Sequence, residues 1–180
     1  VLVIPVRGII SNAAREGFIR TRPSMVQEVV SQLRLAEKDE NVKAVIFKID
    51  SPGGSVTASD ILYNEIEVFK ARTGAKVVAA MMGLTASGGY YISLPADYIL
   101  AHPTTITGSI GVIFRRPRVT GLMNKVGIAI EVNKSGKNKD IGSPFRAATP
   151  EEEKIFQDLT DLLAVRFIDL VAKHRKFEPE

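Results

Sequence analysis

Two apolar runs, each followed by a glycine-bearing loop and a helix-like segment, constrain the fold of this chain more than any other feature. The runs are 42–49 and 76–82. Strand-like runs that alternate with helical segments are typical of an α/β fold with a mostly parallel sheet. In such a sheet, sites form beyond the carboxyl ends of the strands. We therefore expect the loops 50–54 and 83–87 to lie side by side at one end of the sheet.

The other predicted elements fit the same alternation. A capping-box signature, Ser24 with Gln27, starts a predicted helix that ends near Lys38. In the last predicted helix, a proline occupies the first turn, where its missing N–H costs nothing, and three acidic residues follow at the positive end of the helix dipole. The full set comprises strands at 1–6, 42–49, 76–82, 98–101 and 128–133, with some strand character in 104–113, and helices at 24–38, 55–72, 120–126 and 149–173.

Composition narrows the class of protein. A chain of 180 residues with 45% hydrophobic and 24% charged residues fits one globular domain, here 1–180. The net charge of +4 is modest, and aromatic residues are not interleaved with basic ones, so we expect no nucleic-acid partner. The absence of cysteine excludes a disulfide framework and a thiolate nucleophile, and no apolar run approaches the ~20 residues of a membrane span. The chain begins at Val1 in a strand-like run, so we expect an excised domain.

Ser87 is the strongest candidate for a catalytic residue. It lies between the strand-like run 76–82 and an apolar, aromatic segment that is compatible with a helix, and its neighbours are small. A nucleophile needs small neighbours so that a substrate carbonyl can approach. The N-terminus of a helix, here at Gly88, offers free N–H groups to a developing oxyanion. An ordinary tight turn explains the same residues, because serine and glycine are common in turns.

The loop Ser51-Pro-Gly-Gly54 is the second candidate part of a site. Glycine permits a close approach of the backbone, so the N–H groups of Gly53 and Gly54 are able to face a substrate oxygen. By itself this loop is better explained as an ordinary strand-to-helix turn. Next to Ser87, however, it would supply an oxyanion hole for the serine.

A serine nucleophile needs a base, and the sequence offers few. His174 lies in a charged tail and is expected to be solvated, whereas His102 ends a predicted strand shortly after Ser87 and reads most simply as a structural histidine. Lys139 is a further possibility, because a lysine acts as a base when burial and its neighbours favour the neutral amine. Spacing alone does not single out Lys139.

Four motifs, in order, resemble the signal peptide peptidase A family of bacterial serine peptidases over nearly the whole chain. They are Ser51-Pro-Gly-Gly54, Thr85-Ala-Ser-Gly-Gly-Tyr-Tyr91, Thr107-Gly-Ser-Ile-Gly-Val112 and Lys134-Ser-Gly-Lys-Asn-Lys-Asp-Ile-Gly-Ser-Pro144. The resemblance implies a Ser/Lys dyad in which Ser87 is the nucleophile and Lys139 the general base. It also implies that Ser109 orients the lysine and that Gly54, with Gly88 at the helix start, lines the oxyanion hole.

The resemblance carries further expectations. The family fold is similar to that of Clp protease subunits and crotonases, a repeated β-β-α superhelix with a mostly parallel sheet. Family members degrade remnant signal peptides, use no cofactor or metal, and form rings or domes in which serine and lysine come from neighbouring subunits. They lie on the outer face of the bacterial cytoplasmic membrane, held by an N-terminal anchor that this chain lacks.

Three alternatives stay open at the level of sequence. His102 lies near the position at which Clp proteases carry their base, so a Ser87–His102 dyad is possible. A crotonase-like acyl-CoA enzyme would share the two-loop oxyanion hole without a serine nucleophile. A non-catalytic scaffold would keep the fold, although intact Ser87, Lys139, Ser109 and Gly54 argue against it. The basic tract 114–118 is interpreted as a solvated face, with a rim that meets lipid headgroups as the weaker interpretation.

Overall fold

The computed structural model describes residues 1–14 and 22–176 of the chain. The chain divides into two compact units, one formed by Val1–Gly111 with Arg166–Glu180 and the other by Val112–Val165. The sequence-based assignment of one catalytic domain over residues 1–180 stays a prediction. No helix within the two described stretches is both long and apolar enough to cross a lipid bilayer.

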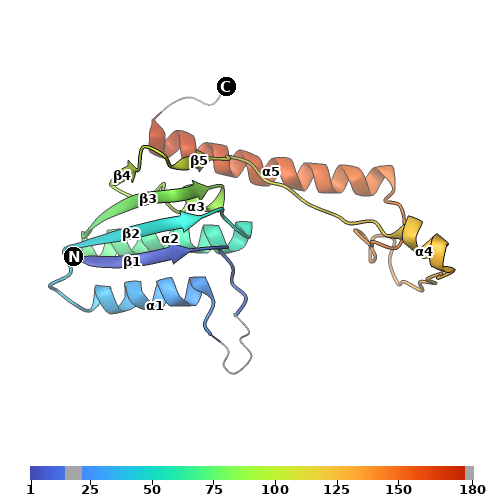
Figure 1. Ribbon diagram of the computed structural model, residues 1–180, viewed down its shortest axis with the longest axis horizontal. Coiled ribbons are helices and arrows are strands. Elements are labelled where there is room, and N and C mark those ends of the chain that lie inside the picture. Colours follow the sequence, from blue (N-terminus) through green and yellow to red (C-terminus); the bar gives the residue numbers. More distant parts are fainter. Residues whose placement is uncertain (15–21, 177–180) are drawn as a thin grey trace. The chain divides into compact units, whose positions relative to one another are not determined.

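A parallel sheet forms the centre of the first unit (Figure 1). Its strands are β1 (Leu2–Arg7), β2 (Ala44–Ser51), β3 (Lys76–Ala86) and β4 (Tyr98–Ala101), in that order across the sheet. The short β5 (Ile106–Gly108) pairs with the second half of β3, and all of these pairings are parallel. The predicted α/β class with a mostly parallel sheet is confirmed.

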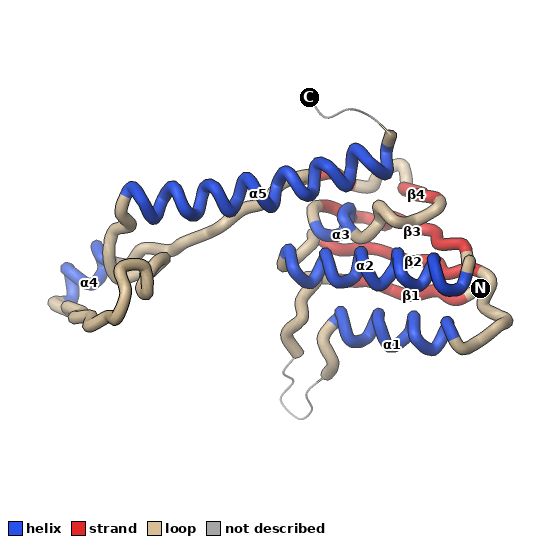
Figure 2. The backbone as a smooth tube through the Cα atoms, turned by 180° about the vertical axis from the view of Figure 1, so that it is seen from behind, coloured by secondary structure: helices blue, strands red, loops and turns tan. Residues whose placement is uncertain are grey.

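Two helices, α1 (Met25–Glu37) and α2 (Val56–Thr73), pack against this sheet, and α2 lies in front of the strands in Figure 2. Ser24 caps α1 in the predicted capping box, because its hydroxyl accepts from the Gln27 N–H at 3.2 Å while the Gln27 side chain accepts from the Ser24 N–H at 2.9 Å. The core between helices and sheet is apolar and mainly aliphatic, and it includes Ile4, Val6, Val29, Leu33, Val45, Phe47, Ile49, Leu62, Ile66 and Val77.

Strand β3 extends four residues beyond the predicted end at residue 82. Its second half pairs with β5, in the register Leu84↔Ile106 and Ala86↔Gly108. Pairing with β5, about twenty residues further along the chain, therefore extends β3. The apolar pattern of residues 76–82 does not predict this extension. The strand delivers the chain to Ser87, after which the short helix α3 (Gly88–Tyr91) begins.

The second unit contains α4 (Thr120–Val126) and most of α5 (Pro150–Arg175). The prediction of a strand at 128–133 is wrong: this segment has no strand pairing among the described residues. Ile128, Ile130 and Val132 are 57%, 45% and 54% exposed. Their alternation suits a strand, but a strand also needs a partner for its backbone groups, and no neighbouring described segment in this unit supplies one.

The end of α5 belongs to the first unit and is held there by polar contacts. Asp60 on α2 accepts hydrogen bonds from the Tyr91 hydroxyl at 2.6 Å and from Arg166 on α5 at 2.6 Å. The expectation that His174 is solvated is wrong, because its Nε2 lies 2.7 Å from the Tyr63 hydroxyl and its ring packs edge-on against Tyr63. Phe167 and Val171, on the same helix, are buried beside Tyr91.

Candidate active site

Ser87 occupies a sharp turn between β3 and α3. Its φ of 51° lies in the left-handed region that non-glycine residues rarely adopt. Strain of this kind persists only where the surroundings impose it, and it concentrates at functional sites. The surroundings here are defined: the Ser87 N–H donates to the Gly108 carbonyl at 2.8 Å, and its own carbonyl accepts from the Tyr91 N–H at 2.9 Å. The Ser87 side chain makes no capping hydrogen bond and is partly exposed, as an available nucleophile requires.

The loop 52–54 lies directly against this turn, as the sequence predicts. A Cβ added to Gly53, whose φ is +96°, would lie 2.5 Å from the Gly88 nitrogen and 3.0 Å from the Ser87 Cβ. A Cβ added to Gly88 would in turn lie 3.2 Å from both the Gly53 Cα and the Gly54 nitrogen. The absence of side chains at these glycines therefore allows the two loops to touch beside the serine.

Two N–H groups remain available at this junction. Those of Gly54 and Gly88 have no acceptor among the described residues, whereas the Gly53 N–H donates to the Ser51 hydroxyl at 3.1 Å. The expectation that Gly53 also offers its N–H to a substrate is therefore wrong. Gly54 is exposed and Gly88 lies at the first position of α3, where the N–H has no partner within the helix. A pair of free donors beside a serine is the arrangement that stabilises an oxyanion.

Buried hydroxyl groups hold the two loops in place, and sequence reasoning did not identify them. Ser51 donates to the Gly8 carbonyl at 2.6 Å while it accepts from Gly53, and Thr85 donates to the Ile49 carbonyl at 2.8 Å. Both residues are fully buried. Their signal in the sequence was their position within the two motifs, one residue before the proline at 52 and two residues before Ser87.

Ser109 lies next to the nucleophile turn through the pairing of β3 with β5. Gly108, the acceptor of the Ser87 N–H, immediately precedes it, and the Thr107 hydroxyl donates to the Thr85 carbonyl at 2.7 Å. Ser109 also has a positive φ, 54°, and is exposed. Two strained serines thus occur on the adjacent ends of paired strands.

His102 is held away from this site. Its N–H donates to the Met81 carbonyl at 3.2 Å, and Met81 lies six residues before Ser87 on the β3 path. At roughly 3.3 Å per residue along a strand, this offset exceeds the reach of a histidine side chain. The Nδ1 of His102 is instead 2.9 Å from the Thr104 hydroxyl. The structure therefore does not bring His102 to Ser87.

Lys139 belongs to the second unit, whereas Ser87, Gly88, Gly54 and Ser109 all belong to the first. It lies in a succession of turns, and its side chain is exposed, with no hydrogen bond or ion pair found for it in the described part of the chain. The structure thus brings together four of the five predicted site residues within one unit.

Comparison with known proteins gives a consistent result. The sequence profile of peptidase family S49 matches residues 70–180. A putative signal peptide peptidase SppA from Enterococcus faecium is 33% identical over 178 residues, which cover 99% of this chain and 52% of that protein. Protease 4 from Salmonella typhi is 41% identical over 150 residues, 83% of this chain and 24% of that protein. A putative protease of Methanocaldococcus jannaschii is 45% identical over 139 residues, 77% of this chain and 44% of that protein.

The chain therefore spans about half or less of the length of these relatives. Among solved structures, a ClpP1 mutant from Listeria monocytogenes superposes with a TM-score of 0.61 at 18% identity, covering 98% of this chain and 73% of that one. That likeness shows a Clp protease-like α/β fold. From the match over residues 70–180, which include Ser87, Ser109 and Lys139, we conclude that the chain belongs to peptidase family S49.

Proposed function

We propose that this protein is a serine endopeptidase with Ser87 as nucleophile and Lys139 as general base. The observation that carries the proposal is the junction of the two loops, where a strained, accessible serine lies beside the free N–H groups of Gly54 and Gly88. Membership of a peptidase family supports the same reaction. A crotonase-like reaction would leave the strained Ser87 without a role.

The proposed reaction has two steps, acylation of Ser87 and hydrolysis of the acyl-serine, and Lys139 acts as the base in both. The neutral amine of Lys139 takes the proton from the Ser87 hydroxyl as Oγ attacks the peptide carbonyl. The resulting oxyanion accepts hydrogen bonds from Gly54 and Gly88. The protonated lysine then gives its proton to the leaving amine, which frees the new N-terminus and leaves an acyl-serine. Water, activated by the same lysine, hydrolyses the ester and regenerates the hydroxyl. Ser109 would orient the lysine amine towards Ser87.

The substrates we propose are remnant signal peptides, bound in extended form. Support comes from the family resemblance and from a relative named as a putative signal peptide peptidase. The residues that flank Ser87 are small, which suits small or aliphatic side chains in the substrate. On the same basis we propose that the catalytic domain acts on the outer face of a bacterial cytoplasmic membrane, attached through an N-terminal segment.

The experiment that tests the chemistry compares three single variants. Ser87→Ala and Lys139→Ala should abolish hydrolysis of a signal peptide, followed by mass spectrometry, whereas His102→Ala should leave it near the wild-type rate. Activity of the wild type should rise with pH as the amine of the base loses its proton. A serine-directed phosphonate should label Ser87 in the wild type. An inactive His102→Ala protein together with an active Lys139→Ala protein would refute the dyad.

We further propose that the working site is shared between subunits of a homo-oligomeric ring or dome. Ser87 and Lys139 lie in different compact units, and α5 carries exposed apolar residues, among them Leu159, Leu162 and Val165. A head-to-tail contact would place each lysine loop against the serine of the next subunit. Mixing inactive Ser87→Ala chains with inactive Lys139→Ala chains, under conditions of subunit exchange, should then restore a fraction of activity. Confirmed exchange without recovery would show that each dyad forms within one chain.

A further inference from the structure

Backbone hydrogen bonds hold the turns in which Lys139 lies. The Lys139 N–H donates to the Gly136 carbonyl at 3.1 Å, and the Ser143 N–H donates to the Asp140 carbonyl at 3.1 Å. The lysine side chain itself has no partner among the residues that the structure describes. A lysine has a flexible four-carbon stem, so the direction of its amine depends on where the backbone places its Cα.

Asp140, the residue directly after Lys139, is the most strongly held point of this segment. Its carboxylate accepts from Lys134 Nζ at 2.6 Å and from Arg146 Nε at 2.8 Å, and its backbone carbonyl accepts from Arg146 Nη2 at 3.3 Å. Hydrogen bonds from Arg146 and Lys134 hold the pKa of the Asp140 carboxyl well below its ordinary value. Arg146 therefore donates hydrogen bonds to both the side chain and the backbone of Asp140, the residue next to Lys139.

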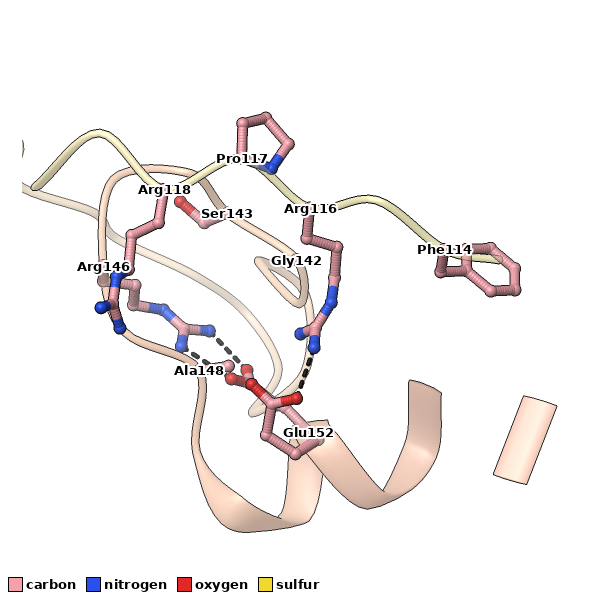
Figure 3. Close-up of a pocket in the computed structure, with 10 residues that line it drawn as sticks. Phe114, Arg116, Pro117, Arg118, Gly142, Ser143, Arg146, Ala148 and Glu152 are labelled. Atoms are coloured by element: carbon pink, nitrogen blue, oxygen red, sulfur yellow. Dashed lines mark hydrogen bonds and ion pairs between the residues drawn. The ribbon is translucent and has the colours of Figure 1, made fainter. Parts of the chain in front are cut away.

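The other edge of the Arg146 guanidinium is bound to Glu152, as Figure 3 shows. Arg146 Nη1 donates to Glu152 Oε2 at 2.8 Å, and Nη2 donates to Oε1. Glu152 is only 3% exposed, although it is one of three consecutive glutamates in the first turn of α5. Hydrogen bonds from Arg146, and one from the Thr149 N–H, lower the pKa of Glu152 to about 2. A buried carboxylate of this kind requires its cation.

Glu152 is in turn fixed to the start of the helix by a capping box. The Thr149 N–H donates to Glu152 Oε2 at 2.9 Å, and the Glu152 N–H donates to the Thr149 hydroxyl at 3.2 Å. The turn after Lys139 also approaches α5 directly, because a Cβ at Gly142, whose φ is +77°, would lie 3.1 Å from Phe156 Cζ. A continuous series of contacts thus runs from the first turn of α5 through Arg146 to Asp140.

We propose that Arg146 and Glu152 are positioning residues for Lys139, which fix the lysine turn to the N-terminus of α5. The inference rests on the proposed function, in which Lys139 is the general base. Arginine suits this role because its planar fork binds two carboxylates at once, which a lysine ammonium does not reproduce. A displacement of the base by about 1 Å is enough to reduce turnover on the order of 10²-fold.

A purely structural role for the pair predicts a different result. If Arg146 and Glu152 only stabilise the second unit, then their loss lowers the melting temperature while the folded enzyme keeps its turnover and its pH dependence. If they position Lys139, then kcat falls, the KM for the peptide stays close to its original value, and the rising limb of the kcat–pH profile moves. These readouts separate the two roles in protein that is still folded.

The decisive variant is the double substitution Arg146→Gln with Glu152→Gln, which removes both charges together and leaves no unpaired buried carboxylate at position 152. Arg146, Glu152 and Arg118 all line one pocket of about 320 Å³, which Figure 3 shows. The matched control is Arg118→Ala, because Arg118 is exposed and has no ion pair among the described residues. All variants are assayed below their melting temperatures. We expect the double variant to lose about 10- to 100-fold in kcat and the control to resemble the wild type.

Single Arg146→Ala chains give a second test through subunit mixing. They should recover activity with Ser87→Ala chains, which supply an intact lysine turn, and should gain nothing from Lys139→Ala chains. The inference is overturned if the folded double variant keeps wild-type kcat and pH profile, if Arg118→Ala loses as much, or if the mixing pattern is reversed. An active Lys139→Ala enzyme would instead refute the proposed function, and a failure of the positioning role is therefore recognised by an inactive Lys139→Ala beside an unaffected double variant.

Discussion

Replacement of Gly53 by alanine tests the junction of the two loops more directly than any substitution of Ser87. The new Cβ would lie 2.5 Å from the Gly88 nitrogen, 3.0 Å from the Ser87 Cβ and 3.1 Å from the Ala86 carbonyl oxygen. None of these atoms is the end of a flexible side chain, so the backbone of the nucleophile turn has to move. We expect the Gly88 N–H to be displaced from the oxyanion position.

The cost of this substitution has two parts. The φ of +96° disfavours any Cβ by about 1–2 kcal/mol, and forcing a methyl group into a closed contact costs about 1–3 kcal/mol more. The sum, about 2–5 kcal/mol, is a large fraction of the ~5–15 kcal/mol that stabilises a typical domain. Gly8→Ala is the matched control, because Gly8 has a φ of +81° but no atom within 4 Å of the new Cβ, and so carries the backbone cost alone.

The assay combines urea denaturation with the rate at which a serine-directed phosphonate labels Ser87. The free energy of unfolding should fall by about 1–3 kcal/mol more for Gly53→Ala than for Gly8→Ala. Labelling should slow by up to the 10²–10³-fold that the loss of one oxyanion donor costs, while Gly8→Ala should be labelled at the wild-type rate. Equal stabilities and equal labelling rates for the two variants would refute the close approach of Gly53 to the nucleophile turn.

Three further outcomes follow from other contacts. Gly54→Pro removes the free N–H and also places a Cβ 1.9 Å from the Ile10 carbonyl oxygen, so it should lower stability and reduce kcat by at least the 10²–10³-fold that one lost donor costs; a folded variant with full turnover would exclude the donor role. Asp60→Asn should cost about 1–3 kcal/mol in urea denaturation, because Asp60 accepts from both Tyr91 and Arg166; an unchanged midpoint would contradict this role. Because the pKa of Glu152 is lower in the folded protein than in the unfolded chain, its ionised carboxylate stabilises the fold. This stabilisation should be complete above pH 4.5 and should disappear as the pH falls towards about 2. In the Glu152→Gln variant, the free energy of unfolding should depend less on pH in this acid range. Acid titration followed by circular dichroism measures this dependence.

The sequence predicted those features whose interacting residues are close together along the chain. The capping box of Ser24 and Gln27 was predictable because both partners lie within one turn of α1. The turn at Ser87 was predictable because only small residues allow a strand to pass so abruptly into a helix. The arrangement of the two loops followed from the rule that parallel strands carry their sites at one end of the sheet.

Features that depend on distant partners were not predictable in this way. The alternation of Ile128, Ile130 and Val132 predicts an apolar face, but a strand also needs a partner strand, and none pairs with this segment in the described part of the chain. The spacing of Thr149 and Glu152 fits a capping box within one turn, but the burial of Glu152 against Arg146 depends on a residue outside α5 and is not visible in the sequence. The charge pattern around His174 does not reveal that its ring lies against Tyr63, which is more than a hundred residues earlier in the sequence.

The exposure of Lys139 gives the shared site a physical rationale. A lysine works as a base only where its neutral form is favoured, and burial is the usual means. Lys139 is exposed within its own compact unit, whereas the junction beside Ser87, in the other unit, offers two free N–H groups and a partly exposed hydroxyl. If assembly covers the lysine with the serine face of the next subunit, then burial of the base and completion of the site occur in the same step. Turnover per chain should therefore fall on dilution below the concentration at which the oligomer dissociates. An enzyme whose specific activity is independent of dilution through that transition, followed by light scattering, would contradict this coupling.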